Sequence, residues 1–215
     1  MKKYLVEFIG TFFFVLTIVM SVNSGVGNVA PIAIGSALMV MIFAGGHISG
    51  GHFNPAVTLA VFLRGKCDAS DVPGYMIAQI LGGAIAALTS GFLLGSFPEG
   101  VVNVTTADLS DKIAPALLAE FLGTFALCYV VLQTATAKGT AGNSFYGLAI
   151  GFTVTAMAYA LGGVSGGAFN PAVAVGISVA EMVSWNNIWI FLVGNFSAGA
   201  AAAFAFKFVN DPSDN

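Results

Sequence analysis

The stretch that decides the fold stands twice in the chain. It is Ser49-Gly50-Gly51-His52-Phe53-Asn54-Pro55-Ala56-Val57, and it returns 116 residues later as Ser165-Gly166-Gly167-Ala168-Phe169-Asn170-Pro171-Ala172-Val173. At the same interval Ala33-Ile34-Gly35 returns as Ala149-Ile150-Gly151. Near the start of each half, Glu7-Phe8-Ile9-Gly10-Thr11-Phe12 returns as Glu120-Phe121-Leu122-Gly123-Thr124-Phe125. Similarity at a fixed interval indicates an internal repeat. We therefore predict two repeats, residues 1–112 and 113–215, which together form one domain.

The composition places this repeat in a membrane. The chain is 57% hydrophobic and 8% charged, with a mean hydropathy of +0.90. A soluble domain carries about 25% charged residues. Lipid tolerates so apolar a surface, whereas water does not. The net charge of −3 is small and the acidic residues are scattered, so we expect no nucleic-acid partner.

Six apolar stretches have the length of about 20 residues that a bilayer span needs. They cover residues 4–22, 32–49, 74–95, 113–135, 145–162 and 187–208. Two shorter apolar stretches, 54–63 and 170–180, begin at Asn-Pro pairs. Proline suits the first turn of a helix, where its missing N–H would have no partner anyway. We predict an all-α membrane protein with six transmembrane helices and two re-entrant half-helices.

The basic residues predict the orientation. Those on one side of the six-span arrangement are Lys2, Lys3, Arg64, Lys66, Lys138 and Lys207, and only Lys112 falls on the other side. By the positive-inside rule both termini are cytoplasmic. We expect a multi-pass protein of the plasma (inner) membrane, whose first apolar stretch is a span and not a signal peptide. Segment 97–112 becomes an outside loop, in which Asn103-Val104-Thr105 matches a glycosylation sequon.

Each repeat holds three spans, an odd number, so the two repeats lie upside down relative to one another. Such inverted repeats with interrupted helices place their functional site near the membrane midplane. We expect the half-helices to enter from opposite faces and to meet there. Their first residues are the two triplets Asn54-Pro55-Ala56 and Asn170-Pro171-Ala172.

The two triplets indicate a pore. A bare helix N-terminus in hydrocarbon leaves N–H groups unpaired, and it is tolerated only inside protein or beside a water-filled cavity. The amides of Asn54 and Asn170 are predicted to donate into that cavity. The positive ends of both helix dipoles would favour a neutral solute with a lone pair and oppose cations. The alternative interpretation is that the two triplets are only structural N-caps and that no pore exists. The occurrence of the triplets as an inverted pair disfavours this alternative.

Glycines and acids accompany the triplets. The glycines before the half-helices are Gly45, Gly46, Gly50 and Gly51, and Gly162, Gly163, Gly166 and Gly167. They permit irregular backbone whose carbonyls face a lumen. Glu7 and Glu120 are intramembrane acids, which are functional candidates by default. A proton relay is one interpretation. The duplication of both acids together with the loops favours the other, in which each carboxylate anchors the re-entrant loop of its own half.

Metal, cofactor and enzyme functions find no support in the sequence. His47 and His52 flank the first triplet, and we predict that they line a vestibule or fix the loop. Gly163 and Ala168 occupy the matching positions of the second half, so a metal site is not expected. Cys67 and Cys128 form neither a disulfide framework nor a metal site. We expect no cofactor and no catalysis, because no cluster of nucleophile, base and orienting acid is present.

The sequence resembles the major intrinsic protein family, which comprises the aquaporins and glycerol facilitators. The resemblance lies in Gly46-His47-Ile48-Ser49-Gly50-Gly51-His52-Phe53-Asn54-Pro55-Ala56-Val57-Thr58, in the two Glu-Phe-x-Gly-Thr-Phe starts and in Ala78-Gln79-x-x-Gly. It covers essentially the whole chain. It implies a right-handed bundle of six helices with two half-helices. It also implies a homotetramer with one pore in each subunit.

One departure from the family concerns selectivity. The second motif of the family normally ends Asn-Pro-Ala-Arg, whereas Val173 stands in the fourth position here. By spacing from the two asparagines, the resemblance assigns the other filter positions to Ile34, Ala158 and Gly167. Pore diameter, lining hydrogen-bond groups and fixed charge decide selectivity in such channels. We therefore expect a wide, apolar filter, with Phe43 and Phe169 as candidates to fill some of the space.

The predicted function is passive diffusion of water and small neutral solutes. Glycerol, urea, ammonia, hydrogen peroxide, metalloid hydroxides and small organic acids are the candidate solutes, and the missing arginine also predicts some ion or proton leak. A secondary transporter is the first alternative, since inverted repeats with broken helices occur there too. A closed structural membrane protein is the second, because apolar constrictions can lose their water.

Overall fold

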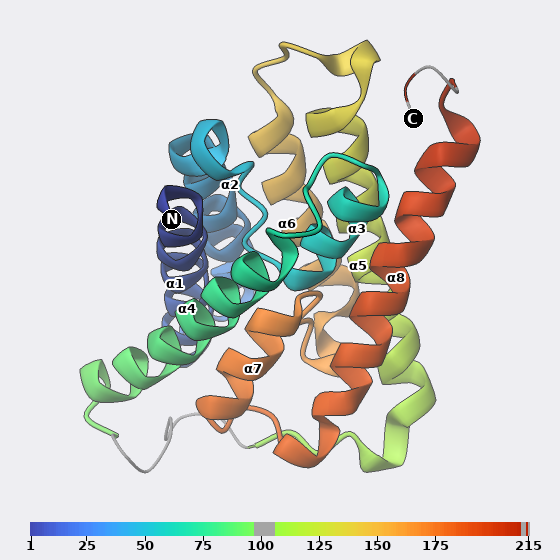
Figure 1. Ribbon diagram of the computed structural model, residues 1–215. Helices are drawn as coiled ribbons and strands as arrows, with labels where there is room; N and C mark the ends of the chain where they lie inside the picture. Colours follow the sequence, from blue (N-terminus) through green and yellow to red (C-terminus); the bar gives the residue numbers. More distant parts are fainter. Residues whose placement is uncertain (97–105, 212–213, 215) are drawn as a thin grey trace.

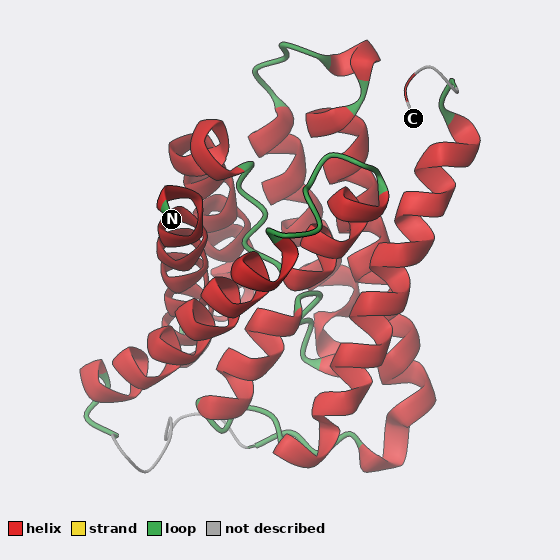
Figure 2. Ribbon diagram, in the orientation of Figure 1, coloured by secondary structure: helices red, strands yellow, loops and turns green. Residues whose placement is uncertain are grey.

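The computed structural model describes residues 1–96, 106–211 and 214, so the sequon at Asn103 lies outside the described residues. Within that part the chain is helical, without a strand (Figure 2). The long helices are α1 Lys2–Asn23, α2 Ala30–Ser49, α4 Val72–Leu93, α5 Ile113–Val131, α6 Tyr146–Ser165 and α8 Ile188–Val209. The half-helices are α3 Pro55–Leu63 and α7 Pro171–Val179. Short 3-10 turns cover Gly27–Val29, Ser110–Lys112, Lys138–Thr140 and Trp185–Asn187, and a π-helical turn covers Leu132–Thr136.

Six helical segments of the described residues are long and apolar enough to cross a membrane. The predicted all-α architecture with six spans and two half-helices is therefore confirmed. An even number of crossings places both termini on the same side. We call that side inner and the opposite side outer.

Each half of the chain packs its half-helix against the other half. Helix α1 packs against α2 and α4, and α5 packs in the same way against α6 and α8, while α2 and α6 contact each other. Each half-helix packs chiefly on the last span of the other half, α3 on α8 and α7 on α4. Figure 1 shows α3 and α7 approaching the middle of the bundle from opposite ends. This reciprocal arrangement is the one expected of an inverted repeat.

The sequence explains why the half-helices begin where they do. Asn54 and Asn170 have extended backbones, with φ of −158° and −165°, and they precede a proline in the first helical position. The Oδ1 of Asn54 accepts the N–H of Ala56 at 2.8 Å, and the Oδ1 of Asn170 accepts that of Ala172 at 2.9 Å. An Asn side chain at the N-cap satisfies a helix donor that would otherwise have no partner.

The expectation for four of the glycines was wrong. Gly45, Gly46, Gly162 and Gly163 belong to the last turns of α2 and α6, which extend to Ser49 and Ser165. Only the next pairs, Gly50 with Gly51 and Gly166 with Gly167, have positive φ, between 65° and 96°. At Gly45, close packing outweighs the low helix propensity of glycine. A Cβ at Gly45 would lie 2.6 Å from a side-chain carbon of Val6. The predicted span 145–162 also ended too early, since α6 continues to Ser165 and ends at Gly166, whose φ is 96°.

Candidate functional site

The N-termini of the two half-helices meet and are bonded to each other reciprocally. Asn54 Nδ2 donates to the carbonyl oxygen of Phe169 at 3.0 Å, and Asn170 Nδ2 donates to that of Phe53 at 2.9 Å. An asparagine amide has two N–H donors, so each keeps one beyond this bond. Both asparagines line the same narrow cavity. The pair thus joins the two repeats and keeps donors beside that cavity, and the sequence indicated only the second of these roles.

Glu7 holds the first re-entrant loop. Its carboxylate is fully buried. Oε1 accepts from Ser49 Oγ at 2.6 Å and from the His52 N–H at 3.0 Å. Oε2 accepts from the Phe53 N–H at 2.6 Å and from Gln79 Nε2 at 2.8 Å. The four donors belong to the end of α2, to the loop and to α4, and Glu7 lines none of the three cavities described below.

Glu120 repeats this arrangement in the second half. Its Oε1 accepts from Ser165 Oγ at 2.6 Å and from the Ala168 N–H at 3.0 Å. Its Oε2 accepts from the Phe169 N–H and from Asn195 Nδ2, both at 2.8 Å. Gln79 and Asn195, 116 residues apart, are thus equivalent partners of the two carboxylates. The hydrogen bonds favour the loop-anchor interpretation of both acids over a proton relay.

Strained phenylalanines end both loops. Phe53 and Phe169 have φ of 48°, a left-handed conformation that costs a non-glycine residue about 1–2 kcal/mol. Their rings occupy the space that a side chain on α1 or α5 would fill. A Cβ on Gly10 would lie 2.1 Å from the Phe53 ring, and one on Gly123 would lie 2.3 Å from the Phe169 ring. The glycine in each Glu-Phe-x-Gly-Thr-Phe start is therefore required by a ring from the loop.

Three cavities lie in series through the bundle. An outer cavity of about 320 Å³ shares Phe14, Val154 and Ala168 with a narrow cavity of about 10 Å³. The narrow cavity shares His52 and Val131 with an inner cavity of about 350 Å³. The shared walls make them successive parts of one path past the two asparagines.

The structure brings the four predicted filter positions together. Ile34, Ala158, Gly167 and Val173 all line the outer cavity, whose lining contains no charged side chain. They come from α2, α6, the second loop and α7. Phe43 and Phe169 do not line this cavity. Phe43 packs on Gly147 and Phe169 lines the narrow cavity.

Phe14 was missed by sequence reasoning. This residue of α1 is 3% exposed and lines both the outer and the narrow cavity. The repeat offered a signal, because the α1 and α5 starts are 113 residues apart and Leu127, the counterpart of Phe14, also lines the narrow cavity.

The two histidines differ in position. His52 lines the narrow and the inner cavity, and its Nδ1 lies 3.1 Å from Thr58 Oγ1. His47 is exposed in the last turn of α2 and lines none of the three cavities. Among the described residues no group of three His, Cys, Asp or Glu side chains is placed to hold a metal ion.

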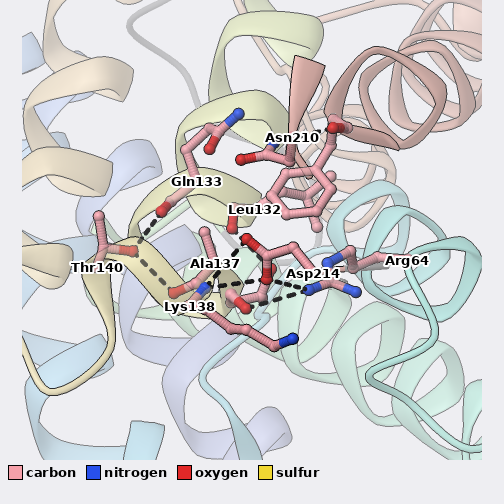
Figure 3. Close-up of polar contacts among 10 residues, drawn as sticks. Arg64, Leu132, Gln133, Ala137, Lys138, Thr140, Asn210 and Asp214 are labelled. Atoms are coloured by element: carbon pink, nitrogen blue, oxygen red, sulfur yellow. Dashed lines mark hydrogen bonds and ion pairs between the residues drawn. The ribbon is translucent and has the colours of Figure 1, made fainter. Parts of the chain in front are cut away.

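A polar cluster closes the inner end of α3 (Figure 3). Arg64, which follows α3, is 2% exposed and places its guanidinium 4.5 Å from the Phe206 ring. It donates to the Thr136 carbonyl and to Asp214 Oδ1, each at 3.3 Å. Asp214 Oδ1 also accepts the Lys138 N–H at 3.0 Å. The cluster ties the end of the half-helix to the π-helical turn and to the C-terminal segment, which the sequence did not indicate.

The fold and the path define a class of protein: a helical membrane channel built as an inverted repeat around two half-helices. Residues 1–206 match the model of the major intrinsic protein family. The "Probable aquaporin NIP4-2" of Arabidopsis thaliana is 33% identical, over 97% of this chain and 74% of its own. The "Glycerol uptake facilitator protein-like 6" of Lactiplantibacillus plantarum is 34% identical, over 96% and 97%. The chain belongs to the major intrinsic protein family.

A solved structure carries the same fold. The aquaglyceroporin from Plasmodium falciparum superimposes with a TM-score of 0.81 over 99% of this chain and 98% of its own, at 21% identity. The family model and the relatives confirm the resemblance to the major intrinsic protein family, and the solved structure confirms the fold.

Proposed function

We propose that the protein is a passive channel that conducts water and small neutral solutes past the paired asparagines, through an outer entrance without fixed charge. The observation that carries this proposal is the meeting of two half-helix N-termini, reciprocally bonded, beside cavities that follow one another through the bundle. The names of the relatives support the same class, since they are aquaporins and a glycerol facilitator, which are channels and not enzymes.

The outer entrance sets the expected charge of the solutes. Ile34, Ala158, Gly167 and Val173 offer no side-chain hydrogen-bond donor, so the filter does not attract anions and does not replace a solute's hydration with side-chain hydrogen bonds. Glycerol, urea, ammonia, hydrogen peroxide and neutral metalloid hydroxides are the candidates beside water. Cations are opposed by the positive ends of α3 and α7, and they meet no charged side chain in the lining of the outer cavity. Without the filter arginine this barrier is weaker, and we propose a small ion leak.

The surroundings of the pore complete the proposal. Long helices that expose apolar side chains support a lipid-embedded, multi-pass protein. Both termini are proposed to be cytoplasmic, as the basic residues indicate, in a plasma (inner) membrane. A homotetramer with one pore in each subunit follows from the family resemblance. Glu7 and Glu120 are proposed as anchors of the two loops, and His52 as a vestibule residue.

The test is stopped-flow light scattering on proteoliposomes that contain the wild type or Val173→Arg. Val173 is 1% exposed and lines the outer cavity, so an arginine there adds bulk and charge at the entrance. We expect the wild type to conduct water and at least one of urea and glycerol. The variant should lose solute flux more than water flux, and ion leak should fall.

Other outcomes point to the alternative functions. Accumulation of a solute against its gradient would support a coupled transporter. Liposomes that pass nothing faster than protein-free ones would support a closed structural protein. Equal solute-to-water ratios in wild type and variant would remove Val173 from the filter.

A further inference from the structure

The inverted repeat builds a second set of filter positions on the inner side of the asparagines. Shifted by 116 residues, Ile34, Gly167 and Val173 correspond to Ile150, Gly51 and Val57, and Ala158 corresponds to Ile42. All four counterparts line the narrow cavity. The outer set therefore surrounds about 320 Å³ and the inner set about 10 Å³, although both are made by equivalent parts of the fold.

The difference between the two sets lies mainly at one position. At three of the four positions the two sets have the same residue type, namely Ile, Gly and Val. At the fourth position the outer set has Ala158 and the inner set has the larger Ile42. Ile42 is 1% exposed, so its side chain is enclosed. Its backbone is packed against the re-entrant loop, because a Cβ on Gly51 would lie 3.5 Å from Ile42 Cα. The side chain consequently has little room to withdraw when a solute passes.

Neighbouring side chains strengthen the constriction. Leu38 and Leu127, each 4% exposed, line the narrow cavity beside Ile42 and Ile150. A cavity of about 10–15 Å³ is needed to hold one water molecule. The narrow cavity, at about 10 Å³, therefore has room for about one water molecule. The polar side chains on its wall are His52, Asn54 and Asn170. An apolar passage of this width discriminates by diameter.

We propose that Ile42, with Ile150, Leu38 and Leu127, sets the size limit of this channel, on the inner side of the asparagines and not at the outer filter. The inference rests on the proposed channel function and adds where solutes are selected. Slender neutral molecules pass the inner constriction singly, while the outer cavity admits wider ones that go no further. Ile42 is thus the specificity-determining residue.

The experiment compares two identical truncations on one helix. Ile42→Ala enlarges the narrow cavity, and Ile34→Ala, two turns earlier on α2, enlarges the outer one. Stopped-flow scattering on proteoliposomes gives the ratio of glycerol to water permeability for each variant and for the wild type. We expect Ile42→Ala to raise this ratio several-fold, and both Ile42→Val and Ile34→Ala to raise it less than Ile42→Ala does.

The opposite pattern would overturn the proposal. If Ile34→Ala raises the ratio as much as Ile42→Ala, the outer filter sets the limit. If Ile42→Ala conducts water with an unchanged ratio, Ile42 does not select. Should Ile42→Ala fail to fold, Ile42→Val and Ile150→Val decide by the same criterion. A wild type that conducts no water would refute the channel itself, which distinguishes the two failures.

Discussion

Replacing Glu120 by Gln tests the scaffold of the second loop. Glu120 is fully buried and its two oxygens accept four hydrogen bonds, from Ser165, Ala168, Phe169 and Asn195. Glutamine has nearly the same shape, but its amide nitrogen donates where a carboxylate oxygen accepted. Two of the four donors therefore face a group that cannot accept.

The expected cost follows from the number of donors left without a partner. Each buried unsatisfied group costs about 1–3 kcal/mol, so two cost about 2–6 kcal/mol. Rotating the Asn195 amide does not remove this cost, because its Nδ2 also donates to Thr124 Oγ1 at 2.9 Å and would turn to the place where the buried Oδ1 has no partner. A domain of this length loses about 2–4 °C in midpoint for each kcal/mol.

Thermal unfolding of the detergent-solubilised protein measures the effect. Glu181→Gln is the matched control, since it makes the same chemical change at an exposed residue, where substitutions stay within about 0.5 kcal/mol. We expect the Glu120→Gln midpoint to fall by several degrees and the control to stay near wild type. Equal midpoints for the two variants would refute the anchoring argument. A lost proton flux with an unchanged midpoint would instead restore the proton-relay interpretation.

Two further predictions concern the first half. Gly10→Ala places a Cβ 2.1 Å from the Phe53 ring and should cost about 1–3 kcal/mol by overpacking. Gly91→Ala, with no neighbouring atom within 4 Å of the new Cβ, is its control, and equal unfolding midpoints would contradict the ring packing. The hydrogen bond from Lys3 lowers the pKa of Asp71 below its ordinary 3.8. The contact therefore contributes its full stability above pH 3.8 and loses it as the pH falls through the lowered pKa. Asp71→Asn should lower the midpoint at pH 7, and its difference from wild type should shrink as the pH is lowered below 3.8; a constant difference would contradict the linkage.

Much of the fold was readable in the sequence because the determining features are local. An Asn-Pro pair before a short apolar stretch specifies an N-cap and a first turn without help from the rest of the chain. The predicted half-helices 54–63 and 170–180 accordingly lie close to the observed Pro55–Leu63 and Pro171–Val179. The irregular backbone expected at Gly45, Gly46, Gly162 and Gly163 was wrong, since α2 and α6 continue past these glycines to Ser49 and Ser165.

The site was readable in part. The repeat located the two asparagines and both glutamates, and the family spacing gave four residues that share one cavity. It did not indicate that each asparagine bonds to the carbonyl of the opposite loop. Nor did it indicate that Asp214 folds back onto Arg64. Both contacts join segments more than 100 residues apart, and no local pattern specifies such a pairing.

By itself, therefore, the sequence determined that this chain spans a membrane six times, consists of two repeats of opposite orientation and brings two capped half-helices to the midplane. Hydrophobic length and proline position are properties of single segments, and the orientation of the repeats follows from counting three spans in each. Only the tertiary structure decided where the path is wide and where it is narrow. Pore width depends on side chains from α1, α2, α5 and α6 that converge from distant parts of the chain. It is fixed by how closely those helices pack, as at Ile42 against the loop of Gly51.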